Sequence, residues 1–275
     1  MEKISRKSFV KGALGLGLTG VLAGCASSAS STAASASSTA APAEKKEFTF
    51  ADTVRWDAQY DVVVMGMGAA GMVAAKTAAD NGAKVVIVEK CEEGKAGGNT
   101  KVCGQLFAYA NGDKDAAKSY YTALAGGRDI EPEIIDAISE GVANMADILA
   151  DEFGFNKDEY MDWTGVNVGG TNMGAMSPEY PEMPGHEKMA LWTTHAGASD
   201  GYLYQGLKQN VTDRVDAIDV WYSSPAKSII QDPVTKTVVG VTVERDGKEM
   251  NIRALNGVCI CTGGFECNKE MVQHY

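Results

Sequence analysis

Three closely spaced glycines and a carboxylate one strand further on are the residues of this chain best suited to chemistry. The segment from Tyr60 to Lys90 reads YDVVVMGMGAAGMVAAKTAADNGAKVVIVEK and places Gly66, Gly68 and Gly71 in the pattern G-x-G-x-x-G. This pattern allows a tight turn, close approach of a diphosphate to the backbone, and close packing of a helix on a strand. Glu89 lies 21 positions beyond Gly68, where an acid can accept hydrogen bonds from an adenosine ribose. These residues predict a dinucleotide site.

The elements that must position these residues follow from the apolar pattern around the glycines. YDVVVMG is an apolar, β-branched run, so it predicts a buried strand. We expect a helix over residues 69–80 that ends at Asn81-Gly82, a pair typical of a left-handed cap. Ala69 and Ala70 open this helix, whose first N–H groups would hold the phosphates. AKVVIVE then predicts a second parallel strand, which ends just before Lys90, a further candidate contact.

The type of dinucleotide is narrowed by the acid and by two later segments. A carboxylate at Glu89 favours a ribose without a 2′-phosphate, hence FAD or NAD over NADP. CEEGKAGGNTKVCGQ comes next along the chain, and NGVCICTGGFECNKEM lies near the end of the sequence. These segments resemble the flavoprotein family of fumarate reductases and succinate dehydrogenases, with the related ketosteroid dehydrogenases and urocanate reductases. The resemblance covers about residues 57–275 and implies FAD as the cofactor.

The resemblance implies further cofactor contacts in both segments. In the family, a GGNT loop runs under the isoalloxazine ring, and a strand ending in A-T-G-G-F closes the FAD domain. The matching residues are Gly97, Gly98, Asn99, Thr100 and Gly104 in the first motif, and Thr262, Gly263, Gly264 and Phe265 in the second, with Cys261 in place of alanine. The glycine pair lets the main chain lie against a flat ring, and the Asn and Thr side chains offer hydrogen-bond donors. Ala226, just after Pro225, is the candidate for a backbone contact with adenine.

The rest of the chain predicts helices first and strands later. Helices are predicted in DAAKSYYTALAGG, in EPEIIDAISEGVANMADILADEFG as far as Gly154, and in SDGYLYQGLKQNVTDR. The segment from Tyr160 to Pro184 predicts a long irregular excursion. From Ala217, four apolar runs predict strands of the β-meander that the family inserts before the closing strand, with Asp246-Gly247 as a tight turn. We therefore expect an α/β fold, a Rossmann-like FAD-binding domain with a parallel sheet, helices and a β-meander insertion.

The first 56 residues predict a lipoprotein signal peptide followed by a flexible linker. Residues 1–25 combine a positively charged start with the glycine-rich apolar run FVKGALGLGLTGVLAGC. Leu22-Ala23-Gly24-Cys25 resembles the lipobox of bacterial lipoproteins, which implies a lipidated Cys25, and SRKSF resembles the twin-arginine export motif with Lys for the second Arg. Residues 26–56 are rich in Ser and Ala and predict a flexible linker. The protein is therefore expected outside the cytoplasm, held to a bacterial membrane by the lipid anchor alone.

Charge and composition exclude other classes of function. The chain carries a formal net charge of −11, and removal of residues 1–25, which carry +3, makes it more acidic still. Such acidity argues against nucleic acid as a partner. The odd number of cysteines after Cys25 predicts no disulfide framework, and Cys259 and Cys261 are expected as small apolar residues on one face of a strand. The three histidines are scattered, so no metal site is predicted.

Two histidines and a group of methionines are weaker candidates for function. His186 and His195 flank EKMALWTT; either could face the flavin, but a surface or core position is the expectation for both. The methionines in the irregular excursion suggest a soft-metal or redox cluster, although gap-filling is the commoner role of this side chain. They are Met161, Met173, Met176 and Met183.

Three functions are compatible with these features. The first is an exported FAD-dependent oxidoreductase acting on CH–CH bonds. It would reduce an activated C=C bond of a small-molecule substrate, an unsaturated carboxylate or enone, or catalyse the reverse dehydrogenation, with hydride passing through flavin N5 and electrons from a membrane or cytochrome donor. In the family, a capping domain beyond the GGF motif carries the catalytic residues. Residues 57–275 are therefore expected to be the N-terminal part of the FAD-binding domain, and no catalytic residue is assigned.

The second function is a truncated, non-catalytic flavin-binding or electron-relay lipoprotein. The third is an NAD-dependent dehydrogenase, which the GGNT loop disfavours.

Overall fold

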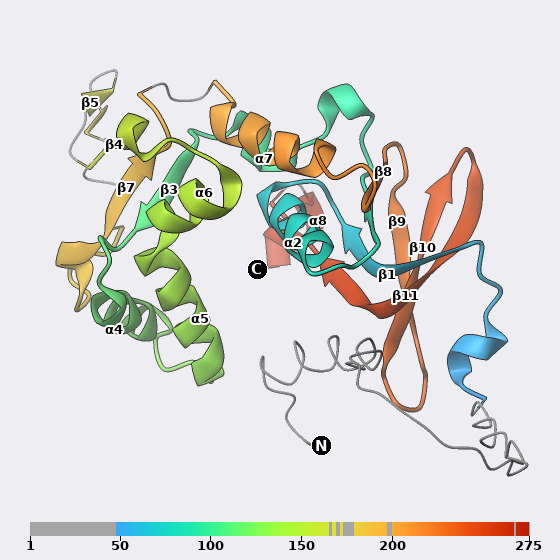
Figure 1. Cartoon of the computed structure of the whole chain (residues 1–275). Coiled ribbons are helices and arrows are strands. Elements are labelled where there is room, and N and C mark those ends of the chain that lie inside the picture. The colour runs from blue at the N-terminus through green and yellow to red at the C-terminus, as the bar shows by residue number, and fades with distance from the viewer. Residues whose placement is uncertain are drawn as a thin grey trace, which may run out of the picture. The chain divides into compact units, whose positions relative to one another are not determined.

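A six-stranded sheet is central to the part of the chain that the computed structural model describes, residues 48–164, 167–168, 171–172, 179–196, 200–266 and 268–274 (Figure 1). Its strand order is β8-β2-β1-β11-β10-β9. The strands are β1 (Ala58–Met65), β2 (Val85–Val88), β8 (Ile218–Trp221), β9 (Ala226–Gln231), β10 (Val238–Arg245) and β11 (Lys248–Ile260). β8, β2, β1 and β11 pair in parallel, and β11, β10 and β9 pair antiparallel. The expected Rossmann-like α/β fold is confirmed.

Two apolar layers, one on each face of this sheet, fix its central strands. Along β1 and β2, successive side chains point alternately into the apolar cluster on one face of the sheet and into the cluster on the other face. Val64 and Ile87 pack with helices α2 (Ala69–Asp80) and α7 (Tyr202–Thr212), whereas Val63 and Val86 pack with the meander. Because both faces are covered, these strands read as continuous apolar runs rather than alternating ones. The predicted bounds of α2 are confirmed, with Asn81 at the C-cap and Gly82 at a φ of +85°.

β11 is both the last strand of the meander and a strand of the parallel part of the sheet. It pairs antiparallel with β10 as the last meander strand, and it continues in parallel beside β1, as far as Ile260 opposite Met65. Gly257, with a φ of +147°, lies next to the register shift between these partners. β8 differs from expectation, because it pairs with β2 in the parallel sheet and is not part of the meander. The predicted turn at Asp246-Gly247 is confirmed, since both residues have positive φ.

A second group of elements is built on a three-stranded sheet (Figure 1). This sheet has the order β3-β7-β4. Its elements are β3 (Leu106–Tyr109), β4 (Met161–Asp162), β7 (Ala190–Thr193), α4 (Lys114–Leu124), α5 (Pro132–Ala143) and α6 (Met145–Phe153). The single helix predicted up to Gly154 is wrong in one respect, because it breaks at Asn144, whose φ of −108° and ψ of 11° are not helical. The left-handed cap at Gly154 ends α6 as predicted.

The remaining elements are short. They are η1 (Phe50–Thr53), η2 (Glu93–Lys95), α3 (Gly98–Val102), η3 (Lys157–Glu159), β5 (Asn167–Val168), β6 (Thr171–Asn172), η5 (His186–Lys188) and α8 (Lys269–His274). Residues 48–56 of the predicted linker are described: Ala51 is buried, and the Trp56 indole N–H donates to its carbonyl oxygen at 2.8 Å. The predicted leader with Cys25, the rest of the linker, Met173 and Met176 lie outside the described residues. Among the described helices, none combines the length and apolar character needed to cross a membrane.

Candidate cofactor-binding site

A cavity of about 640 Å³ opens at the carboxyl ends of β1, β2 and β11. This is the edge of a parallel α/β sheet at which ligands bind. Most of the residues predicted to contact the cofactor line this cavity. They are Gly66, Gly68, Ala69, Ala70, Glu89, Lys90, Gly98, Asn99, Thr100, Ala226, Thr262, Gly263 and Gly264. The structure therefore brings together four segments that are far apart in the sequence.

Three glycines predicted to contact the cofactor, and Phe265 of the TGGF motif, do not line the cavity. A Cβ at Gly71 would overlap the carbonyl oxygen of Gly66, so Gly71 serves the close packing of α2 on the loop before it. At Gly97, with a φ of +119°, a Cβ would lie 2.5 Å from Cε2 of Tyr204, so this glycine makes room for a ring of α7. Gly104 faces Leu106 and is not brought to the cavity.

The first two glycines of the loop have different physical roles. Gly66 has a φ of +97°, and a Cβ there would lie 2.5 Å from the carbonyl oxygen of Cys261. Its own N–H donates to Val88 O at 2.8 Å, which holds the loop at the end of β2. Gly68 has a φ of −78°, and the nearest atom to an added Cβ is Thr100 Oγ1 at 3.7 Å. Gly66 is thus required by the fold, whereas Gly68 keeps the space in front of α2 open.

Glu89 is held by two backbone donors at the edge of the cavity. Its side chain is buried, with an exposed fraction of 6% for the residue. Oε2 accepts from Met67 N at 2.9 Å, and Oε1 accepts from Cys91 N at 2.8 Å. Each carboxylate oxygen has further lone pairs, which can accept hydrogen bonds from ribose hydroxyls. The acid therefore lies beside the glycine loop, in the place that the spacing predicted.

The N-terminus of α2 faces the GGNT segment, residues Gly97 to Thr100. Gly68 gives the helix no side-chain cap, and Ala69 N donates to Thr100 Oγ1 at 2.9 Å. Asn99 Nδ2 donates to Glu266 Oε1 at 2.9 Å, so the GGNT segment also contacts the residue after the TGGF motif. A hydrogen bond from its own backbone N–H, with the one from Asn99, lowers the pKa of the Glu266 carboxyl. Helix N–H groups and a hydroxyl thus converge where a diphosphate would bind.

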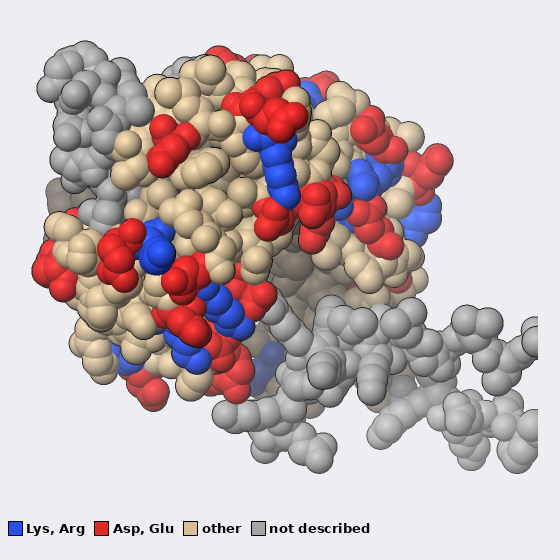
Figure 2. Space-filling model, turned by 60° about the vertical axis from the view of Figure 1, so that its left-hand side comes forward, with Lys and Arg blue, Asp and Glu red and all other residues tan. Residues whose placement is uncertain are grey.

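The other residues of the cavity lining were not predicted from the sequence as cofactor contacts. They are Met65, Met67, Val88, Cys91, Lys95, Pro225, Ile260, Cys261 and Glu266. Most are direct neighbours of a predicted residue, so contiguity along the chain was the signal available for them. The lining carries two lysines, Lys90 and Lys95, and two carboxylates, Glu89 and Glu266. Acidic and basic side chains are also interleaved on the molecular face shown in Figure 2.

Cys259, near the end of β11, and Cys261, directly after it, are packed as apolar residues. Cys259 and Cys261 both pack against the cluster that joins the sheet to α2 and α7, so they share one face, as predicted. Burial raises the pKa of both thiols, which disfavours the reactive thiolate form.

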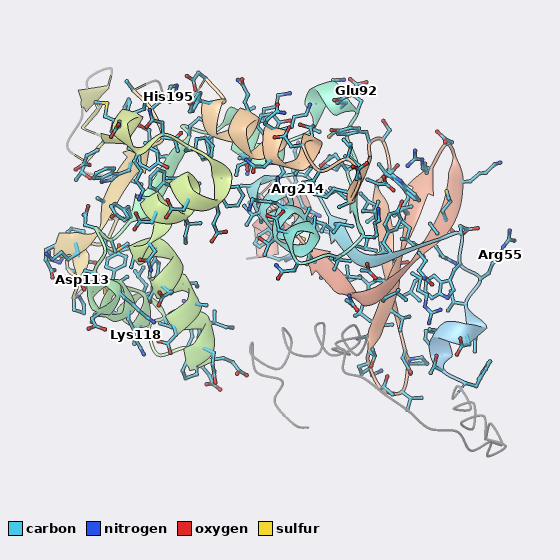
Figure 3. The ribbon with its side chains drawn as sticks, viewed as in Figure 1. Arg55, Glu92, Asp113, Lys118, His195 and Arg214 are labelled. Carbon is cyan, nitrogen blue, oxygen red and sulfur yellow. The ribbon has the colours of Figure 1, made fainter. Side chains whose placement is uncertain are left out.

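The two histidines considered for the flavin do not line the cavity. His195, labelled in Figure 3, lies just after β7. Its Nε2 lies 2.7 Å from Asp200 Oδ2, and its ring stacks on Tyr202 with centroids 4.1 Å apart. His186 Nδ1 lies 2.9 Å from Met183 O. Met183 packs in a small cluster beside α4, which fits the gap-filling interpretation.

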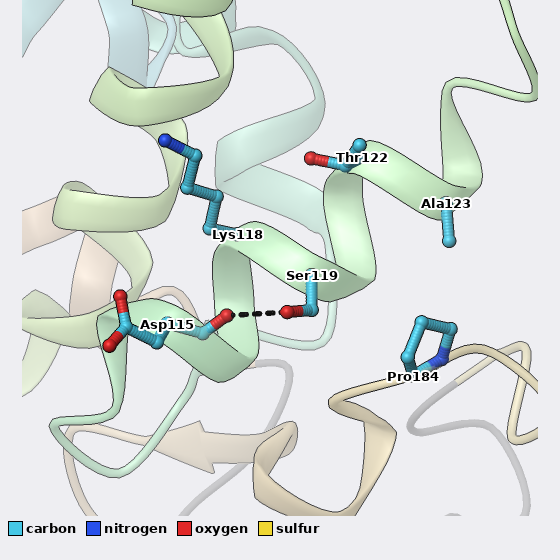
Figure 4. Close-up of a pocket in the computed structure, with 6 residues that line it drawn as sticks. All are labelled: Asp115, Lys118, Ser119, Thr122, Ala123 and Pro184. Carbon is cyan, nitrogen blue, oxygen red and sulfur yellow. Dashed lines mark hydrogen bonds between the residues drawn. The ribbon is translucent and has the colours of Figure 1, made fainter.

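A second hollow lies on α4 and has a different character. Its lining is Asp115, Lys118, Ser119, Thr122, Ala123 and Pro184 (Figure 4). Ser119 Oγ donates to the backbone oxygen of Asp115 at 2.9 Å, and Lys118 forms an ion pair with Asp136 of α5. None of the residues predicted to contact the cofactor lines this hollow.

Comparison with known proteins decides the family. The sequence profile of the family described as "FAD binding domain" matches residues 61–275. The chain belongs to this family. FAD is therefore its cofactor, and the resemblance to fumarate reductases and their relatives is confirmed.

Three relatives illustrate the range of the family. The chain is 30% identical over 226 residues to an NADH:fumarate oxidoreductase of Klebsiella pneumoniae, covering 78% of the chain and 22% of the relative. It is 28% identical to a urocanate reductase of Eggerthella lenta, covering 78% and 33%. The structure resembles 3-ketosteroid Δ1-dehydrogenase of Sterolibacterium denitrificans with a TM-score of 0.63 at 20% identity, covering 79% and 50%. The chain thus spans no more than half the length of these proteins.

Proposed function

We propose that FAD binds in the cavity at the carboxyl ends of β1, β2 and β11. Its diphosphate would lie at the N-terminus of α2 against Gly68, Ala69 and Ala70, and its adenosine ribose would contact Glu89. The adenine end would face Ala226, and the isoalloxazine end would face the GGNT segment. The observation that carries this proposal is the Glu89 carboxylate, fixed 2.9 Å from the Met67 N–H of the glycine loop and bordering open space.

The proposed reaction is reduction of an activated C=C bond, or the reverse dehydrogenation, by an FAD-dependent oxidoreductase. The relatives' names, fumarate, urocanate and ketosteroid enzymes, support a substrate whose double bond is conjugated to a carboxylate or carbonyl. FAD supplies the hydride-transfer chemistry when it is bound. The residues of this chain would bind the cofactor, orient it and exclude water from its ADP half. None of them is assigned as a catalytic residue.

FAD titration of the full chain tests the site directly. Glu89→Gln should raise the Kd for FAD at least about tenfold, because hydrogen bonds to a charged acceptor contribute about 1.5–3 kcal/mol each. Glu249→Gln on the exposed start of β11 removes the same charge away from the cavity and should leave the Kd unchanged. Equal affinities of Glu89→Gln and the wild type would contradict the proposed ribose contact.

A flavin-binding electron relay is the second candidate function, because the lining of the cavity would hold FAD in the same way in a relay as in an enzyme. FAD-loaded protein should be assayed with a chemically reduced dye and with fumarate-like and enone acceptors. Oxidation of the dye that depends on such an acceptor supports the enzyme. Reversible reduction of the bound flavin with no acceptor consumed supports the relay instead.

We further propose that the protein is exported and lipidated at Cys25, on the evidence of the Leu22-Ala23-Gly24-Cys25 sequence and the preceding apolar run. Expression in a bacterial host with a radiolabelled fatty acid should label the wild type and place it in the membrane fraction. Cys25→Ser should lose the label. Equal labelling of both chains would contradict lipidation at this position.

A further inference from the structure

Gln105 is an unusual residue in the loop between α3 and β3. Its exposed fraction is 1%, although its side chain is a primary amide. Its φ of +62° lies in the left-handed region that a non-glycine residue seldom adopts. A conformation of this kind is energetically unfavourable and persists only where surrounding contacts fix it.

The side chain of Gln105 supplies those contacts in two directions. Nε2 donates to the carbonyl oxygens of Thr100 at 2.8 Å and Cys103 at 3.2 Å. Oε1 accepts from the backbone N of Tyr204 at 3.2 Å. Tyr204 is the third residue of α7, whose N-cap, Gly201, has no capping side chain. One amide therefore satisfies a free N–H at the start of α7 and a carbonyl of the GGNT segment.

The residues that Gln105 joins are the ones that shape the cofactor cavity. Thr100 accepts from Ala69 N of α2 through its hydroxyl while its carbonyl is held by Gln105. Tyr204 donates through its hydroxyl to Ala96 O at 3.1 Å, and its ring fills the space beside Gly97. The GGNT segment is thus held at both ends, against α2 and against α7. Gln105 closes this chain of contacts from outside the cavity.

We propose that Gln105 is a positioning residue that holds the GGNT segment in the conformation that binds FAD. This inference rests on the proposed function of the cavity. The amide does not touch the cofactor in this account. It acts through the Thr100 carbonyl and the first turn of α7, and it sets where the Thr100 hydroxyl and the backbone of Gly98 face the bound group.

Two substitutions in the full chain separate positioning from simple stability. Gln105→Leu keeps the size of the side chain and removes all its hydrogen bonds. Gln105→Gly also removes them but permits the positive φ, so this variant should fold even where the leucine variant does not. Both should raise the Kd for FAD about tenfold, which corresponds to about 1.4 kcal/mol. The visible absorption bands of the residual bound flavin should also shift, because the segment facing the ring is displaced.

Ser139→Ala is the matched control. Ser139 is a fully buried polar residue of α5 whose hydroxyl donates to Ile135 O at 2.7 Å, away from the cavity. Its variant should bind FAD with the wild-type Kd and spectrum. Wild-type Kd and spectrum in Gln105→Gly would overturn the positioning role. Failure of the wild-type chain to bind FAD would overturn the proposed function, and this inference with it.

Discussion

At the scale of single residues, the glycine loop separates what the fold needs from what the ligand needs. Gly66 has a φ of +97° and no room for a side chain, because the backbone of Cys261 lies against it. Gly68 has ordinary dihedral angles, and a Cβ added there would meet only Thr100 Oγ1 at 3.7 Å and Gly97 O at 3.9 Å among the described residues. The same substitution should therefore have different consequences at positions two residues apart.

We expect Gly66→Ala to lower the free energy of unfolding by at least about 1–3 kcal/mol, the cost of a strained backbone, with the overlap against Cys261 O added. Gly68→Ala should change it by less than about 1 kcal/mol. Its methyl group would occupy the space where the diphosphate must approach, so FAD binding should be lost while the fold remains. Urea unfolding and FAD titration of both variants measure the two effects. A Gly68→Ala protein that binds FAD normally would show that the diphosphate lies elsewhere.

At the scale of elements, α2 and α7 are joined at their far ends by one ion pair. Arg214, labelled in Figure 3, lies just after α7. It donates from Nε to Asp80 Oδ1 at 2.5 Å and from Nη2 to Asp80 Oδ2 at 3.2 Å. Asp80 ends α2 and also pairs with Lys76, whose side chain is 7% exposed and lies over the Phe153 ring of α6. The hydrogen bond from Arg214 lowers the pKa of the Asp80 carboxyl. Asp80 therefore links α2 to the end of α7, and its partner Lys76 contacts α6.

Because the pKa of Asp80 is lowered by folding, its stabilising contribution is present above the unfolded value near 4. It is lost as pH falls through the lower folded value. Arg214→Ala should reduce the free energy of unfolding at pH 7 by about 1 kcal/mol, the upper range for a partly exposed pair. The Arg214→Ala protein should also lose less stability than the wild type as the pH falls.

Lys227→Ala, which breaks an exposed pair with Glu244, is the control and should lower the free energy of unfolding by less. Urea unfolding at pH 3 and pH 7 provides the comparison, and identical pH dependence in Arg214→Ala and the wild type would exclude this role.

Some of these elements could be predicted from the sequence and others could not. β1, α2 and β2 follow from local signals, an apolar run, glycines with distinct roles and a left-handed cap. The break at Asn144 could not be predicted, because apolar spacing continues through it and only packing separates α5 from α6. The pairing of β3 with β7 joins residues more than 80 positions apart, and no local pattern encodes it. The contacts of Thr100 with Ala69 and of Gln105 with Tyr204 are hidden for the same reason.

At the scale of the whole molecule, five buried or half-buried tyrosines make the stability of the fold depend on alkaline pH. The pKa is raised, mainly by burial, for five tyrosines: Tyr60, Tyr121, Tyr160, Tyr204 and Tyr222. For Tyr160, burial raises the pKa to about 12, from an ordinary 10.0. A group whose pKa is raised by folding contributes stability below its unfolded pKa and loses it as pH rises through the folded one. The fold should therefore weaken between about pH 10 and pH 12.

Tyr160→Phe tests whether tyrosine ionisation lowers the stability at alkaline pH, because it removes the titrating hydroxyl and keeps the ring. The Tyr160 hydroxyl is buried and has no hydrogen-bond partner in the described part of the chain, so its removal relieves an unsatisfied polar group. We expect a free energy of unfolding at pH 7 that equals or exceeds the wild-type value, and a smaller decrease between pH 10 and pH 12. Tyr204→Phe is the matched variant, because it loses the hydrogen bond to Ala96 O. It should cost about 1 kcal/mol at pH 7. Urea unfolding at pH 7, 10 and 11 measures both, and a Tyr160→Phe protein as unstable at pH 7 as Tyr204→Phe would show that the hydroxyl has a partner after all.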